Sequence, residues 1–261
     1  MKRGLFIFTD TLVAFISRPS PNFNERKGPP DMVVLHYTGM ETAEAALARL
    51  CDAAAQVSAH YVVDEDGTIY SLVPEERRAW HAGVSHWKGE RDINGVAIGI
   101  EIVNPGHEFG YRAFPDVQID AVIGLLDGIR ERWDIPDYRI LGHSDVAPER
   151  KQDPGERFPW DRLVAQGHGI WVEPDLPPEG VMGPPLDVGD VGPGVFALQA
   201  ALGKLGYDIL PGGPYDAQTK AIVTAFQRHW VQSRIDGCAD ALTRVRLMAL
   251  LRMVTLMLEA G

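Results

Sequence analysis

The chain has 261 residues, which is enough for one large domain or two ordinary ones. Its net charge of −11 argues against a nucleic-acid partner, because phosphate binding requires a basic surface. The two cysteines, Cys51 and Cys238, lie far apart and indicate no disulfide framework, and no apolar stretch reaches the roughly 20 residues that span a bilayer.

The first 16 residues have a basic start and an apolar run, as a signal peptide does. Asp10 interrupts the run, and Arg18 and several prolines follow where a small-residue cleavage site belongs. We therefore expect a cytoplasmic protein, with the periplasm as the alternative.

Strand and helix patterns alternate through the first 173 residues. Residues 17–30 read as an irregular lead-in, and the β-branched run Met32–Tyr37 then predicts a buried strand with His36 at its end. Further strands are expected at 59–63, 68–73, 96–103 and 138–141, and helices at 41–55, 115–133 and 160–166. Residues 1–173 are thus expected to form an α/β domain, a mixed sheet flanked by helices.

The pattern changes after a Pro/Gly-rich stretch at 174–186, which predicts a linker. Residues 187–261 predict a small all-α C-terminal domain with helices at 195–205, 216–230 and 239–258. The third helix is strongly apolar, so it could also pack against the first domain or form an oligomer with a second subunit. Without such packing, removing everything after Pro185 should leave the first domain folded.

A turn-rich segment at 141–155, LGHSDVAPERKQDPG, brings His143, Lys151 and Asp153 together and predicts a loop rather than a helix. An imidazole, a carboxylate and a third ligand from a distant strand, His36, would form a metal site with an open position for water, as in catalytic zinc centres. Taken singly, each of these histidines is more often a core or surface residue than a ligand.

Glu101 lies inside the apolar strand pattern at 96–103. A carboxylate is costly to bury there unless it is paired, hydrogen-bonded or functional. It is therefore either a catalytic group or a structural carboxylate paired with an arginine.

Five ordered motifs, LHYTG, SAHYVV, AWHAG, IGIEIVN and LGHSDVAPERKQDPG, resemble the zinc-dependent N-acetylmuramoyl-L-alanine amidases. This superfamily includes phage lysozyme-type amidases and animal peptidoglycan recognition proteins, and the resemblance runs from about Val33 to about Trp171. It implies one Zn²⁺ per chain, a catalytic carboxylate and a cation that stabilises the oxyanion. By the resemblance, His36, His143 and Asp153 hold the metal, Glu101 transfers protons and Lys151 is the cation.

The resemblance also implies a substrate and its contacts. A bacterial enzyme of this kind cleaves the amide between the lactyl group of N-acetylmuramic or anhydromuramic acid and L-alanine, in peptidoglycan recycling or turnover. Its partners are therefore peptidoglycan fragments or murein. The candidate contacts to sugar or stem peptide are Tyr37, Trp80, His81, Asn94 and, for a peptide carboxylate, Arg91. Equally, Trp80 can be core, His81 can support the metal ligands, and Arg91 can be a solvated loop charge.

The motifs LGY, YDAQT, AFQRHW and DGCADALT, between Asp187 and Leu251, resemble the three-helix peptidoglycan-binding domain found beside many wall hydrolases. Such a domain favours an exported enzyme that cuts the wall, whereas the missing signal favours a cytoplasmic one that recycles soluble muropeptides. His229 lies in one of these motifs, matches no ligand position and reads as surface or structural.

Two other functions remain open at this point. A recognition protein would share the fold without hydrolysing its ligand, but the zinc-free relatives have lost metal ligands that are all present here. A zinc peptidase would act on the peptide itself, but the HExxH motif is absent.

Overall fold

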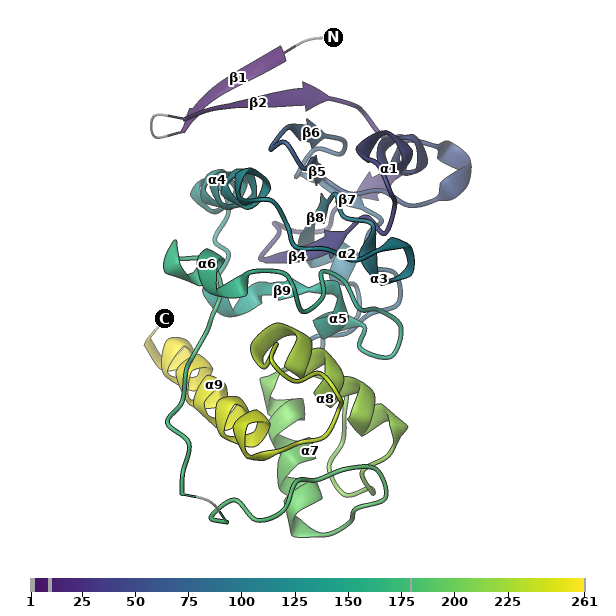
Figure 1. The fold of residues 1–261 in the computed structure, drawn as a ribbon. Coiled ribbons are helices and arrows are strands. Elements are labelled where there is room, and N and C mark those ends of the chain that lie inside the picture. Colours follow the sequence, from purple (N-terminus) through teal and green to yellow (C-terminus); the bar gives the residue numbers. More distant parts are fainter. Residues whose placement is uncertain (1–2, 9–10, 179, 261) are drawn as a thin grey trace.

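A computed structural model describes residues 3–8, 11–178 and 180–260 of the chain. A mixed sheet with helices around it forms the first part, and three helices form the second (Figure 1), which confirms the expected α/β domain with an all-α addition. The larger sheet contains β1 (Arg3–Phe8), β2 (Thr11–Ser17), β4 (Met32–Tyr37), β5 (Tyr61–Val63), β6 (Ile69–Ser71), β8 (Ala97–Ile102) and β9 (Ile140–Gly142). A separate two-stranded sheet pairs β3 (Phe23–Glu25) with β7 (Arg77–Ala79).

The helices differ greatly in length. The first domain contains α1 (Ala43–Leu50), α2 (Ile93–Val96), α3 (Gly106–Phe109), α4 (Asp116–Arg132), α5 (His143–Val146) and α6 (Trp160–Ala165), with 3₁₀ turns η1 (Ala53–Ala55) and η2 (Asp137–Arg139). The C-terminal helices are α7 (Pro193–Leu205), α8 (Ala217–Trp230) and α9 (Ala241–Ala260). Figure 1 shows these three beyond β9 and α5, at the opposite end of the molecule from β1.

The order of strands in the large sheet is β1-β2-β6-β5-β8-β4-β9. Strands β5, β8, β4 and β9 run parallel to one another, whereas β5 pairs antiparallel with β6 in the expected hairpin. The carboxyl ends of the parallel strands therefore meet at one edge of the sheet, where open α/β sheets commonly bind ligands.

Strand β4 is buried on both faces, because its side chains alternate between two hydrophobic clusters. Val33 and Leu35 pack in the cluster that contains the long helix α4. Met32 and Val34 belong to a second cluster, which continues into helices α7, α8 and α9. The central strand thus joins the packing of both domains.

The second cluster makes the two domains one packed unit. Trp87, Leu141 and Val146 from the first domain share it with Phe226 and Trp230 from α8. The first domain was expected to stay folded without the C-terminal helices only if the third helix does not pack against it. Leu247 and Leu250 of α9 belong to this shared cluster, so the alternative left open in the sequence, packing of the third helix against the first domain, is the one that the structure favours.

Several local expectations also need correction. The helix expected over 41–55 ends at Leu50, because Asp52 caps a separate turn by accepting a hydrogen bond from the backbone of Ala54. The irregular lead-in contains β3, which pairs with β7. The described part of the signal-like stretch forms β1 and β2, and β2 joins the sheet beside β6. Within the described ranges, no helix combines the length and apolarity needed to cross a membrane.

The segment expected as a loop at 141–155 begins with a helical turn, α5, whose first residue is His143. The backbone N–H of Gly142 donates to Asp145 Oδ2 at 2.7 Å, so this carboxylate holds the start of the turn. A turn of four residues gives no apolar periodicity that sequence could reveal.

Candidate active site

Two candidate residues lie side by side on the central strands. His36 in β4 is directly opposite Glu101 in the parallel register with β8, so both side chains stand on the same face of the sheet. His36 is almost fully buried. Its Nε2 atom lies 3.1 Å from Nδ1 of His81, which leaves Nδ1 of His36 facing the edge of the sheet.

The other candidates come from residues 142–158, which we call the catalytic segment. Leu35 of β4 pairs with Gly142, so His143 follows β9 at the level of His36. Nε2 of His143 donates to the carbonyl oxygen of Ala82 at 3.0 Å, so this nitrogen carries a proton. The backbone N–H of Ser144 donates to the carbonyl oxygen of Asp153 at 2.9 Å and folds the segment back on itself.

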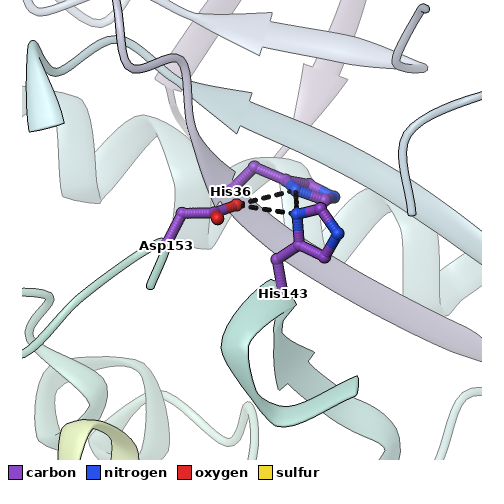
Figure 2. Close-up of side chains that lie close together, drawn as sticks. All are labelled: His36, His143 and Asp153. Atoms are coloured by element: carbon purple, nitrogen blue, oxygen red, sulfur yellow. Dashed lines mark hydrogen bonds and ion pairs between the residues drawn. The ribbon is translucent and has the colours of Figure 1, made fainter. Parts of the chain in front are cut away.

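Three polar atoms, one from β4 and two from the catalytic segment, converge at one point, as Figure 2 shows. Nδ1 of His36 and Nδ1 of His143 are 2.9 Å apart, and each is 3.0 Å from Oδ2 of Asp153. All three side chains are buried. The expected ligand set is therefore brought together, and these residues could hold a metal ion.

The protonation of these groups makes a cation fit. Burial, together with the charge of His143, lowers the pKa of His36 to about 4, so its ring is neutral at pH 7. Burial alone would raise the pKa of Asp153, but the charges and hydrogen bonds of His143 and His36 hold it below its usual range. Because Nε2 of His143 is the protonated nitrogen of its ring, its Nδ1 presents a lone pair when neutral.

The spacing of the three atoms also suits a small metal ion. Ligand atoms about 2.0–2.1 Å from a tetrahedral metal lie roughly 3.3 Å apart, a little more than the separations here. Two imidazole nitrogens and one carboxylate oxygen are a donor set that zinc accepts. The residues present therefore fit the metal that the sequence motifs imply.

Glu101 and Lys151 line the same groove. Oε2 of Glu101 is shielded from solvent and has no hydrogen-bond partner among the residues that the structure describes. Burial, reinforced by the nearby charge of Asp153, raises the pKa of Glu101 well above its ordinary value, while Lys151 opposes the shift. A carboxyl group with a raised pKa can exchange a proton near neutral pH.

The groove has a volume of about 360 Å³. Among the candidate substrate contacts, Tyr37, Trp80 and His81 line it. Asn94 lines an adjoining pocket, where its Oδ1 accepts hydrogen bonds from the backbone of His81 and Ala82 and so fixes the loop behind the ligands.

Arg91 does not line either pocket. Its guanidinium group lies 3.1 Å from a carboxylate oxygen of Asp208, a residue of the C-terminal domain. The candidate partner for a peptide carboxylate is thus paired within the chain itself.

Two arginines that the motifs did not single out do line the groove, Arg49 from α1 and Arg150 beside Lys151. Arg150 donates to the carbonyl oxygens of Ala82 and Val84 and holds the loop that carries His81. Its position next to Lys151 was the available signal in the sequence, whereas Arg49 belongs to an ordinary exposed helix face.

Comparison with known proteins agrees with this geometry. Residues 26–156 match the N-acetylmuramoyl-L-alanine amidase family, and residues 191–247 match a putative peptidoglycan binding domain. The N-acetylmuramoyl-L-alanine amidase AmiD of Escherichia coli is 35% identical over 236 residues, which are 84% of this chain and 82% of that protein.

Solved structures extend the similarity to the fold. AmiD of E. coli in complex with the substrate anhydro-N-acetylmuramic acid-L-Ala-D-γ-Glu-L-Lys matches with a TM-score of 0.72 and 32% identity, over 89% of this chain and 98% of that one. AmpDh3 of Pseudomonas aeruginosa in complex with anhydromuramic pentapeptide matches with a TM-score of 0.70 and 31% identity, over 84% and 90% of the two chains.

Proposed function

Because the chain belongs to the N-acetylmuramoyl-L-alanine amidase family, we propose that it is a zinc enzyme whose metal is held by His36, His143 and Asp153. The bond that it hydrolyses joins the lactyl group of muramic or anhydromuramic acid to L-alanine of the stem peptide. The observation that carries the proposal is the convergence of two imidazole nitrogens and a carboxylate oxygen, 2.9–3.0 Å apart, in the groove that Glu101 lines.

The residues of the groove divide the work of hydrolysis. Zinc held at this site supplies a Lewis acid and lowers the pKa of water to near 7. Glu101 takes a proton from the attacking water and passes it to the leaving amine of L-alanine as the C–N bond breaks. The ammonium group of Lys151 stabilises the negative charge that develops on the carbonyl oxygen.

The substrate class follows from the relatives. AmiD of E. coli has been solved with an anhydromuramyl tripeptide as its substrate, and AmpDh3 with an anhydromuramic pentapeptide. Soluble anhydromuropeptides are therefore the first substrates to expect here. The match to a peptidoglycan binding domain supports murein itself as a second substrate.

The test uses the purified full-length chain with a soluble anhydromuropeptide and, separately, with intact wall sacculi. We expect a stem peptide with a free amino terminus at L-alanine, loss of its release with chelator, and recovery when zinc is returned. Cleavage inside the peptide, or release that persists without metal, would overturn the proposal. Tight binding without release is the behaviour of a recognition protein, and it would overturn the proposal as well.

The compartment is a separate proposal. We expect the enzyme in the cytoplasm, with the periplasm as the alternative, because Asp10 interrupts the apolar run near the amino terminus and Arg18 with several prolines follows it. Fractionation of the native host with an antibody to the chain tests this, and a periplasmic or membrane fraction would contradict it.

A further inference from the structure

The C-terminal domain contacts the catalytic segment mainly through the end of helix α8 and the residues just after it, with one further contact from Tyr207 after α7. We propose that Arg228, His229 and Gln232 are positioning residues, which hold the catalytic segment so that His143 and Asp153 reach the metal. The inference deepens the proposed function and rests on it for the identity of the metal. It gives the C-terminal domain a role in metal binding in addition to any contact with the wall.

The first contact involves a fully buried carboxylate, Asp145, two residues after the ligand His143. Its Oδ2 atom accepts from Nδ1 of His229 at 2.7 Å, and its Oδ1 atom accepts from the hydroxyl of Tyr207 at 3.3 Å. The remaining donor is the backbone N–H of Gly142 at 2.7 Å. Among the residues that the structure describes, two of the three partners of this carboxylate therefore come from the C-terminal domain.

Asp145 links His229 to the turn that carries the metal ligand His143. Its carboxylate holds the backbone N–H of Gly142, the residue before His143, so it fixes the turn from which the imidazole projects. A buried carboxylate that loses a donor must find another or move toward solvent. Either response shifts the turn, and with it the imidazole of His143.

The ring of His229 is itself tightly held. It stacks between Trp160 of α6 and Trp230 of α8, with 3.7 Å between ring centroids on each side. Such stacking fixes the ring plane, so Nδ1 points at Asp145 with little rotational freedom. The side chain thus combines two separable features, a flat ring and a directed donor.

A second group of contacts reaches the other end of the catalytic segment. Arg228 donates to Oε1 of Gln152 at 3.2 Å and lies 4.0 Å from Oε2 of Glu156. Gln232 donates to the carbonyl oxygen of Phe158 at 2.7 Å. These partners flank Asp153, so the carboxylate ligand, like the imidazole ligand, is held by the end of α8 and the residues just after it.

Other contacts between the domains lie away from this segment and supply a control. Asp208 pairs with Arg91 at 3.1 Å, and Lys88 donates its backbone N–H to the carbonyl oxygen of Gly206. An Asp208→Asn variant therefore weakens the domain contact without touching residues 142–158. It separates loss of positioning from a general loosening of the two domains.

The experiment compares two variants of one position in the full-length chain. His229→Phe keeps the stacked ring and removes the donor to Asp145, whereas His229→Asn keeps a donor at the place of Nδ1 and removes the ring. Zinc affinity is measured by competition with a chromophoric chelator, and kcat and KM with a soluble anhydromuropeptide. Hydrogen–deuterium exchange of residues 142–158 in the metal-free proteins gives a readout that needs neither zinc nor hydrolysis.

We expect His229→Phe to bind zinc about 10- to 100-fold more weakly, the range found when groups that support metal ligands are lost. Its kcat should fall more than its KM changes, and exchange in the catalytic segment should rise. His229→Asn should restore the affinity to within a few-fold of wild type, even though its unfolding temperature falls. Arg228→Gln, whose side chain is half-buried, should show the same pattern to a smaller degree and serves if His229→Phe does not fold.

The proposal is overturned if both His229→Phe and Arg228→Gln match Asp208→Asn in zinc affinity and in exchange of the catalytic segment. It is also overturned if His229→Asn is the more damaged of the pair, because the role would then be one of packing. Failure of the proposed function looks different. In that case the wild-type chain itself binds no zinc or releases no stem peptide, and the exchange data still decide whether α8 positions the segment.

Discussion

The active site has two halves that are built in different ways. His36 and Glu101 stand on neighbouring central strands, where the register fixes them side by side. His143 and Asp153 lie on the catalytic segment, which forms few backbone hydrogen bonds with the strands of the sheet. Side chains at the end of α8 and just after it hold this segment instead. The sheet, with His81 behind His36, positions the first half, whereas the C-terminal domain also contacts the second half.

Truncation after Pro185 should have the largest effect on the stability of the chain, because it removes the domain that the catalytic segment contacts. It removes the contacts of the catalytic segment and exposes the shared core, including Trp87 and Val146. Losing large buried side chains costs about 3–5 kcal/mol each, and domains are stable by only about 5–15 kcal/mol, so we expect loss of folding. Thermal unfolding followed by circular dichroism measures this, and a truncated chain that melts like the full one would contradict it.

Asp153→Ala removes a ligand from the catalytic segment alone. We expect the chain to stay folded and to lose zinc and hydrolysis together, with a loss of affinity above the roughly 100-fold seen for groups outside the ligand set. Metal content after dialysis and release of stem peptide measure the two effects. Glu149→Ala, at an exposed position of the same segment, is the control and should keep its zinc.

Glu101→Gln tests the role of Glu101, in the half of the site that stands on the strands, without changing the metal ligands. We expect full zinc content and a fall in kcat of about 10²- to 10⁴-fold, the usual contribution of a general acid–base group. A near-wild-type rate would show that another group moves the proton.

The pH profile of the wild-type enzyme sharpens this assignment. Glu101 accepts a proton only when ionised, and burial raises its pKa well above the ordinary value. The value of kcat/KM should therefore fall as pH decreases through that raised pKa, and the acid limb should disappear in Glu101→Gln. An acid limb that the variant retains would assign the titration to another group.

The smallest effects should come from replacing two glycines by alanine, one glycine in each half of the active site. A Cβ at Gly99 of β8 would overlap the imidazole of His81, which supports His36. A Cβ at Gly142 would lie 2.7 Å from Cδ of Pro154, within the catalytic segment. We expect Gly99→Ala and Gly142→Ala each to destabilise the chain by about 1–3 kcal/mol, as overpacking usually does. Denaturant unfolding measures both, and a wild-type stability at either position would show that its neighbour yields freely.

The strand half could be predicted from the sequence because its signals are local. The apolar runs around His36 and Glu101 give the strands, and a carboxylate inside such a run needs an explanation. The family resemblance of the motifs also named His143 and Asp153 as candidate ligands, which the structure brings together with His36. The turn α5 was missed because four residues among Asp, Pro and Gly carry no helical period.

The contribution of the C-terminal domain could not be predicted in the same way. Asp145 and His229 are 84 positions apart, and neither belongs to a pattern that indicates a contact. Pro/Gly-rich residues separate the domains in sequence and suggested independent units, whereas the apolar faces of α7, α8 and α9 are shared with β4 and β9. Such pairing is a property of the tertiary structure, which composition and periodicity do not encode.

The most direct measurement is a zinc titration of the metal-free full-length chain, with binding and release of stem peptide followed in the same samples. If the strand half and the catalytic segment meet at one metal, the chain binds one zinc and hydrolysis rises in proportion, reaching its maximum at one equivalent. A single catalytic metal held by both halves would be contradicted by either of two results. One is a hydrolysis rate that is already maximal before zinc is added, and the other is zinc binding that restores no hydrolysis.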